Sequence, residues 1–159
     1  MVFSIERNDF MINVIAQNST LYAILSLVWY VLMMIGLYKM FTKAGEAGWK
    51  AIVPLYNFYI LFKISWKTSM FWLLMVLSIA TGVFYSLSIT TLNVAFMYLA
   101  WLMGIIAAIM KAVLAYNISL AYGHGLGYFL GLYLFDSIFI MILGFGSSRY
   151  VGNRYELRR

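Results

Sequence analysis

The stretch that decides the fold reads Lys43-Ala-Gly-Glu-Ala-Gly-Trp49-Lys50-Ala-Ile-Val-Pro54-Leu-Tyr56-Asn57-Phe-Tyr-Ile-Leu-Phe-Lys63-Ile-Ser-Trp66-Lys67. It separates the first two long apolar runs and contains the only proline, together with five charged residues: Lys43, Glu46, Lys50, Lys63 and Lys67. The two runs beside it carry a single charge, Lys39. We therefore expect the chain to leave a membrane and meet water in this stretch.

The composition supports a membrane setting. Of the 159 residues, 65% are hydrophobic and only 10% are charged. Soluble domains are about 45–50% apolar and about 25% charged. A soluble fold of this length could not bury so much apolar surface, so lipid is the expected solvent for most of the chain. The sequence predicts one membrane domain that occupies residues 1–159.

The net charge of +6 has a membrane explanation. The basic residues flank apolar runs, which favours anionic lipid headgroups over nucleic acid as their partner. Cysteine is absent, which excludes disulfides and thiolate metal sites. The N-terminus has no basic region or small-residue cleavage site, so we expect the first span itself to direct insertion.

Four segments are long and apolar enough to cross a bilayer, which needs about 20 residues. They cover about residues 20–40, 68–89, 93–117 and 126–146. Tyr, Trp and Lys gather at their borders, as interfacial anchors do. The predicted fold is an all-α integral membrane protein of the cell membrane with four transmembrane helices.

A short apolar segment over about residues 51–64 is too short to span. Pro54 suits the first turn of a helix, because its missing N–H costs nothing there. Tyr and Trp side chains in and beside it suit the headgroup region. We predict an interfacial or re-entrant helix that packs on protein as well as lipid.

The distribution of Lys and Arg predicts the orientation. The stretch 43–67 is basic, whereas the N-terminus has Arg7 beside Glu6 and Asp9. The stretch 43–67 should therefore be cytoplasmic and the N-terminus outside. Four spans would also put the C-terminus outside, although the tail is basic. The alternative is that the fourth apolar run turns back near Asp136-Ser137 and returns to the cytoplasm.

Two ionisable residues fall inside predicted spans. Lys111 lies in the third and Asp136 in the fourth, at similar depths of one hairpin. Such residues cost about 2.5–3.5 kcal/mol each on insertion scales and often mark functional sites. With Asn117 they form a candidate intramembrane polar site. The structural alternative is that Lys111 extends to the interface and Asp136 only packs.

Small residues recur at helical spacing on the last two spans. One row is Gly104, Ala108 and Ala112, and the other is Gly123, Gly127 and Gly131. Rows of this kind let membrane helices approach closely. We expect the two rows to pack the third and fourth spans together.

The residues that catalysis needs are scarce. His124, the single histidine, lies between glycines and is expected to be a loop residue. A metal site needs further His, Cys or acidic ligands, and acid–base catalysis needs two or three converging polar groups. We predict no enzyme activity, no metal and no cofactor.

The block Lys43–Ile64 resembles a family of small, uncharacterised bacterial membrane proteins with a Lys-Ala-Gly-Glu-x-Gly-Trp motif followed by Ile-Pro-x-Tyr-Asn. The stretch Ala121–Tyr150 is similar to the family's second block. This chain has His124 where the family pattern leads us to expect Lys. Members are often labelled signal peptidase I, yet nothing here could be that enzyme's soluble β domain. The resemblance implies membrane architecture and no mechanism.

Two functions follow as expectations. The first is a non-enzymatic protein that binds anionic lipid or another membrane protein through a surface that we call the platform. The second is a small oligomeric channel or transporter with a polar path through Lys111 and Asp136. The channel or transporter function requires a homo-oligomer. The platform comprises Trp49, Lys50, Pro54, Tyr56, Asn57, Lys63, Trp66 and Lys67.

Overall fold

The computed structural model describes residues 2–155, with side chains described from residue 18. Within this part the chain is all helical and has no strand, as the sequence predicted. The elements are α1 (Val2–Lys43), the 3₁₀ helix η1 (Gly48–Ala51), α2 (Tyr56–Ser65), α3 (Thr68–Thr91), α4 (Val94–Ala121), α5 (Leu126–Leu134) and α6 (Asp136–Phe145).

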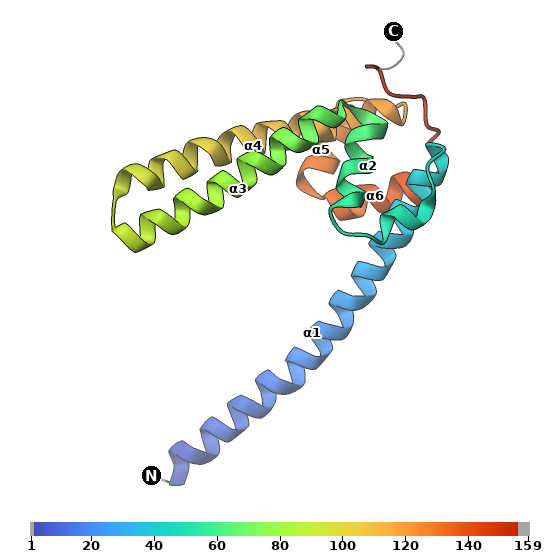
Figure 1. Cartoon of the computed structure of the whole chain (residues 1–159). Helices are drawn as coiled ribbons and strands as arrows, with labels where there is room; N and C mark the ends of the chain where they lie inside the picture. Colours follow the sequence, from blue (N-terminus) through green and yellow to red (C-terminus); the bar gives the residue numbers. More distant parts are fainter. Residues whose placement is uncertain (1, 156–159) are drawn as a thin grey trace.

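The helices form a compact head with two arms (Figure 1). The head comprises residues 33–71 and 110–155, and it holds the main hydrophobic cluster. One arm is the preceding part of α1, and the other is the hairpin of α3 and α4 at residues 72–109. Figure 1 shows that the two arms diverge from the head: α1 runs downward in this view, and the α3–α4 hairpin runs to the left.

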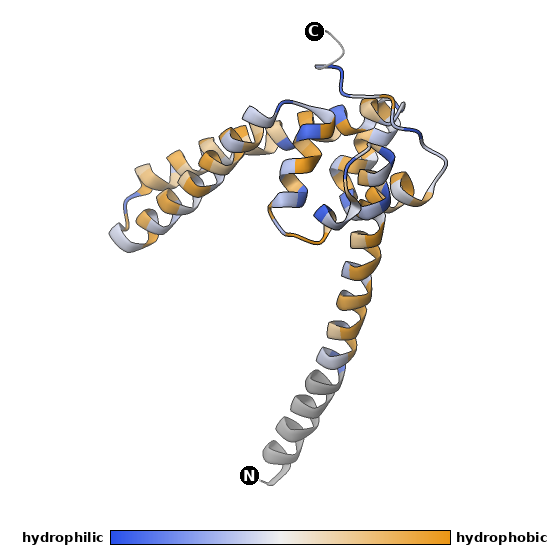
Figure 2. Cartoon of the chain, turned by 45° about the vertical axis from the view of Figure 1, so that its right-hand side comes forward, coloured by the Kyte–Doolittle hydropathy of each residue, from blue (hydrophilic) through white to orange (hydrophobic). Residues whose placement is uncertain are grey.

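Three helical segments are long and apolar enough to cross a membrane: Asn18–Lys43, Thr68–Thr91 and Val94–Ala121. They contain the predicted spans 20–40 and 68–89 and nearly all of 93–117. Figure 2 shows that the described parts of both arms are mainly apolar. The chain is thus a helical protein with three candidate membrane-spanning helices in the part described.

The prediction of a continuous fourth helix over 126–146 was wrong. The run is divided at Phe135 into α5, with 9 residues, and α6, with 10. Asp136 starts the second helix, where its Oδ1 accepts hydrogen bonds from the Ser137 backbone N–H (2.7 Å) and hydroxyl (3.2 Å). A carboxylate at this position favours helix initiation because it satisfies a free N–H and complements the helix dipole.

The two helices fold back on one another as a hairpin. The rings of Tyr128 and Phe139 meet edge to face at 5.6 Å, and Gly131 has no side chain to obstruct the Phe139 ring. At the open end, His124 Nε2 and Ser148 Oγ are hydrogen-bonded at 2.8 Å. The chain therefore leaves the α5–α6 hairpin where it entered, which is the alternative course that the sequence had left open.

The segment 51–64 also differs from the single helix that was predicted. Pro54 lies in a turn between η1 and α2 rather than in the first turn of a helix. Proline disfavours the α conformation at the residue before it, so the chain must turn before α2 begins. In that turn Leu55 has φ 63°, and Tyr56 N–H donates to the Pro54 carbonyl at 2.7 Å. Six of the ten α2 residues are buried, so α2 packs mainly on protein.

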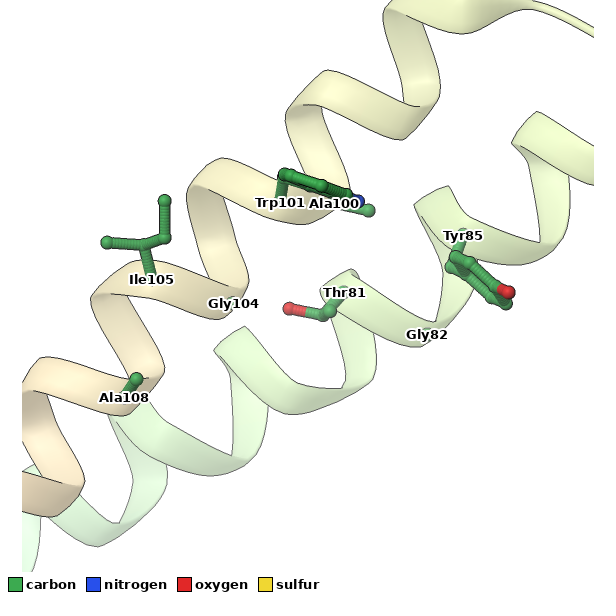
Figure 3. Close-up of a pocket in the computed structure, with 8 residues that line it drawn as sticks. All are labelled: Thr81, Gly82, Tyr85, Ala100, Trp101, Gly104, Ile105 and Ala108. Carbon is green, nitrogen blue, oxygen red and sulfur yellow. The ribbon is translucent and has the colours of Figure 1, made fainter.

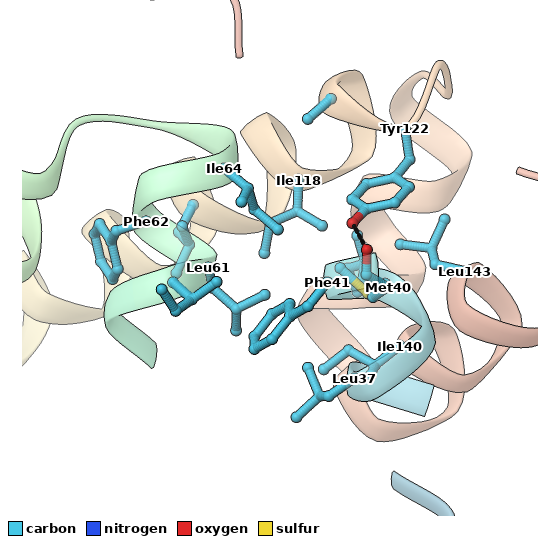
Figure 4. Close-up of a cluster of buried hydrophobic side chains, with 14 of the residues drawn as sticks. Leu37, Met40, Phe41, Leu61, Phe62, Ile64, Ile118, Tyr122, Ile140 and Leu143 are labelled. Atoms are coloured by element: carbon cyan, nitrogen blue, oxygen red, sulfur yellow. Dashed lines mark hydrogen bonds between the residues drawn. The ribbon is translucent and has the colours of Figure 1, made fainter. Parts of the chain in front are cut away.

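The core of the head joins α1, α2, α4 and α6 (Figure 4). Phe41, Phe62 and Leu143 are fully buried in it. Tyr122 is 1% exposed, and its hydroxyl donates to the Met40 carbonyl at 2.7 Å. Burial raises the pKa of the Tyr122 hydroxyl far above its usual range, with a smaller contribution from Tyr150. This tyrosine links the end of α4 to the end of α1.

The two small-residue rows do not face one another, although α4 does pack against α5. Gly104 and Ala108 line a shallow groove with Thr81 and Gly82 of α3, as Figure 3 shows. Ala112 instead lies with α5 residues in another groove. Gly123 occupies a turn at φ 76°, a Cβ on Gly127 would meet nothing, and Gly131 faces Phe139 of α6.

A different glycine pair makes the closest helix crossing. A Cβ on Gly144 of α6 would overlap the Gly36 backbone of α1. These two glycines let α6 lie directly against α1, which fixes the hairpin beside the first span.

Candidate functional site

A cavity of about 450 Å³ lies within the head, where α1, α2, α4 and the α5–α6 hairpin meet. It brings together Lys111 of α4, Asp136 at the hairpin turn and Asn57 of α2. We call it the charged cavity. Most of its other lining residues are apolar: Met33, Leu37, Phe58, Leu61, Ala108, Leu114, Ala115, Ile118, Leu132, Tyr133, Leu134 and Ile140.

The opposite charges in this cavity are not joined to one another. The described residues form two ion pairs, and both belong to Glu46. Lys111 and Asp136 thus share a cavity without an ion pair between them. Asp136 uses Oδ1 to bind Ser137, and no described group is bonded to its second carboxylate oxygen. Both residues are exposed in the described structure, and charges that lie in lipid are stabilised by a partner of opposite sign.

Asn57 adds a third polar group with unused capacity. Its Nδ2 donates to the Ala51 carbonyl at 3.2 Å, which holds the end of η1 against α2. Its Oδ1 accepts no hydrogen bond from any described residue, although Asn57 is only 8% exposed. A buried acceptor without a donor costs about 1–3 kcal/mol. The wall of the charged cavity therefore holds an acceptor that a bound donor would stabilise.

Asn117 does not join this group. It is buried on α4, and its Nδ2 has no partner among the described residues, but it does not line the charged cavity. Of the three residues predicted from the sequence, Lys111 and Asp136 line the same cavity without contact between their charges, and Asn57 lines it in place of Asn117.

Two of the platform's three lysines share one internal carboxylate, which offsets one positive charge. Glu46 is bonded to Lys50 at 2.5 Å and to Lys63 at 2.6 Å. Burial alone would raise the pKa of Glu46, but its bonds to the two lysines outweigh this and lower it. The bond to Glu46 raises the pKa of Lys63. Two of the platform's lysines are therefore committed to an internal carboxylate.

The platform's aromatic side chains form a partly exposed stack. Trp49 is 57% exposed and stacks on Tyr56 at 6.2 Å, which in turn stacks on Tyr59 at 5.9 Å. Trp66 stacks on Phe62, and the Lys67 ammonium lies over the Tyr155 ring at 5.5 Å. Amphipathic rings of this kind suit a membrane–water interface.

The C-terminal tail is attached to the stretch 43–67. Tyr150 donates its hydroxyl to the Ile64 carbonyl at 2.7 Å. Asn153 Nδ2 donates to the Lys63 and Trp66 carbonyls at 3.0 and 2.6 Å. These carbonyls lie at the end of α2, where helices leave acceptors without partners. The tail and the basic stretch therefore share one end of the molecule.

Sequence reasoning missed several residues that hold this end together. Lys43 Nζ donates to the Leu143 and Gly146 carbonyls at 2.6 and 2.8 Å, which caps α6. Glu46, Tyr122 and Asn153 had no assigned role either. Only Glu46 carried a signal, because it is the one acid among the basic residues of the stretch 43–67.

Comparison with known proteins gives one family. No curated protein and no solved structure matches the chain, but the model of a family of unknown function, DUF5684, matches residues 49–153. The match begins at Trp49, so it leaves out the Lys43–Gly48 part of the motif on which the resemblance was based. It includes Asn57, Lys111, Asp136 and both ends of the α5–α6 hairpin. The chain belongs to this family of unknown function.

Proposed function

We propose that this is a non-enzymatic membrane protein that binds a zwitterionic lipid headgroup in the charged cavity. The observation that carries the proposal is the presence of Lys111 and Asp136 in one largely apolar cavity without an ion pair between them. A ligand with a phosphate and an ammonium group would satisfy both charges at once. A ligand of one charge would leave the other side chain without a partner.

The surroundings of the cavity suit a lipid. Its walls are mainly apolar, and α1 and the α3–α4 hairpin extend from the head with exposed apolar side chains (Figure 2). Acyl chains would cover such surfaces favourably in a bilayer. Asn57, which also lines the cavity, has a buried Oδ1 that accepts no hydrogen bond from any described residue, and a small opening of the wall would let it accept one from a bound ammonium group.

The orientation proposed with this function has three spans and a re-entrant α5–α6 hairpin. The N-terminus is outside, and the stretch 43–67 is cytoplasmic, as the Lys and Arg distribution indicates. We place the C-terminal tail in the cytoplasm rather than outside, because Tyr150 and Asn153 bind the end of α2. Arg149 and Arg154 then lie on the same side as the basic stretch, which removes the conflict between the charge rule and a basic tail outside.

The platform has a supporting role in this proposal. Lys67 and the exposed ring of Trp49 are suited to anionic headgroups and the interface, whereas Lys50 and Lys63 are held by Glu46. The platform anchors the head at the cytoplasmic surface, and the ligand site lies deeper.

The second function class, an oligomeric channel or transporter, stays a prediction. Lys111 and Asp136 would serve it as well, but it requires further copies of the chain to enclose a path. Ion flux through liposomes that contain the purified protein, lost in Lys111→Met, would favour this class over lipid binding.

Native mass spectrometry of the full chain tests the binding proposal. The affinity for phosphatidylethanolamine should fall about tenfold in Lys111→Gln and in Asp136→Asn, since each substitution removes one charge-assisted contact. Arg154→Gln, at an exposed position outside the cavity and the platform, is the matched control and should leave phosphatidylethanolamine binding unchanged. Phosphatidic acid lacks the ammonium group, so its affinity for the protein should fall in Lys111→Gln but not in Asp136→Asn.

Two results would contradict the proposal. One is phosphatidylethanolamine binding that neither cavity variant changes. The other is an equal loss of phosphatidylethanolamine binding in Arg154→Gln. The orientation is tested separately by a compartment-sensitive reporter fused after Arg159. A signal from outside the cell would exclude a cytoplasmic C-terminal tail.

A further inference from the structure

A second pocket lies between the two ends of the α5–α6 hairpin. Its volume is about 400 Å³, and it is separate from the charged cavity, with no lining residue in common. Its lining includes His124, Tyr122 and Tyr128 from the entry side of the hairpin and Ser147, Ser148 and Arg149 from the exit. None of the described residues that line it is acidic.

The side chains at this pocket are donors. Arg149 is exposed and takes part in neither of the two described ion pairs, so its guanidinium is available to an anion. The Ser147 hydroxyl has no described hydrogen bond. Arginine offers a planar pair of N–H donors that matches two phosphate oxygens, and hydroxyls complete such sites.

His124 is held in a fixed orientation at the edge of this pocket. Its ring stacks on Tyr128 at 3.6 Å between centroids, and its Nε2 is hydrogen-bonded to Ser148 Oγ at 2.8 Å. The same bond joins the hairpin's entry to its exit, so the loop that carries Arg149 is positioned by the fold. A preorganised loop loses less conformational freedom on binding.

We propose that this pocket is a phosphate-binding site, with Arg149 and Ser147 as donors and His124 beside the bound anion. The chemistry is shared by a phospholipid headgroup and by free phosphate. The neighbouring side chains of Ile142 and Val151 are apolar and exposed, and they suit the glycerol and upper acyl region of a lipid. The site requires neither Lys111 nor Asp136 and is independent of the proposed function above.

The single histidine makes a direct test practicable. Full-length protein labelled with ¹⁵N at histidine, purified in detergent with a tag free of histidine, should give imidazole NMR signals from His124 alone. Dioctanoyl phosphatidylglycerol should shift these signals saturably. Dioctanoylglycerol, with the same chains and no phosphate, should not. Inorganic phosphate is the third probe, and a saturable shift with it would identify free phosphate as a ligand.

Two arginine variants provide the matched comparison. Arg149→Gln should weaken the phosphate-dependent shift about tenfold or more, through loss of the charge-assisted contact. Arg154→Gln, on the same tail but outside the pocket, should leave it unchanged. Helix content by circular dichroism checks that both variants fold. No saturable shift with either phosphate probe, the same shift with dioctanoylglycerol, or equal loss in the two variants would overturn the proposal.

Discussion

The head and the arms differ in how far along the sequence their polar side chains reach to form hydrogen bonds. In the arms, polar side chains bond locally: the hydroxyls of Ser26, Thr81 and Ser88 donate to carbonyls three or four residues earlier in their own helices. In the head, Tyr122 and Asn153 reach carbonyls more than 80 residues away in sequence. The arms can be stable as helices surrounded by lipid, whereas the head depends on long-range contacts.

The same contrast holds for glycine. Gly82, in the arms, has open space where a Cβ would lie, whereas Gly144 in the head abuts the Gly36 backbone. The arms therefore tolerate changes in side-chain volume, and the head resembles the close-packed interior of a soluble protein. Substitutions that are chemically alike should have unequal effects in the two regions.

The largest expected difference is between two Gly→Ala changes. Gly144→Ala should destabilise the protein by about 3 kcal/mol or more, because the new methyl meets backbone that cannot move aside. Gly82→Ala should be neutral or stabilise α3 by about 1 kcal/mol or less. Thermal unfolding of both variants in one detergent measures this. Equal destabilisation would end the distinction between head and arms.

Glu46→Gln tests electrostatics that only the head possesses. It removes both ion pairs of a 13% exposed side chain and should cost about 1–2 kcal/mol at neutral pH. Because the pKa of Glu46 is lowered on folding, its contribution is present above the ordinary value of 4.5 and is lost as pH falls through the folded value. Lowering the pH below 4.5 should thus reduce the difference in unfolding free energy between wild type and variant. A difference that stays constant with pH would show that the stabilisation does not come from the charge of Glu46.

The smallest expected difference concerns two tyrosine hydroxyls. Tyr122→Phe should cost about 1 kcal/mol, because the buried hydroxyl loses its bond to Met40. The cost is limited because the Met40 carbonyl also accepts the Ala44 N–H at 3.2 Å. Tyr98→Phe, at an exposed position on α4, should have no measurable effect. A denaturation series in SDS, with both variants measured in parallel, resolves a difference of this size.

The hydrophobic pattern was sufficient to predict the arms. The long apolar runs over about 20–40, 68–89 and 93–117, in which only Lys39 and Lys111 are charged, are expected to be helical in lipid, since every backbone polar group must be satisfied within the segment. The same rule misjudged residues 126–146. That run is apolar enough to span, but Asp136 starts a second helix and the chain folds back at Phe135. Composition alone does not distinguish one helix that crosses a membrane from two short helices that fold back on each other.

The candidate site was predicted in part, for a similar reason. Lys111 and Asp136 were recognisable because charge within an apolar run is costly wherever it lies. Asn57 was assigned to a surface platform, yet it lines the charged cavity, since the turn at Pro54 and Leu55 directs α2 into the head. Its position depends on helices that are distant in sequence.

Composition and hydropathy were enough to predict helices able to cross a membrane and to identify the residues whose charge needs a partner. Those properties are local, because burial cost and backbone satisfaction follow from each segment's composition. Three other features became visible only in the folded chain: Gly36 lies against Gly144, Glu46 binds two lysines, and the tail is bonded to the basic stretch. Such contacts depend on side-chain shape and on the crossing of distant helices, which hydropathy does not encode.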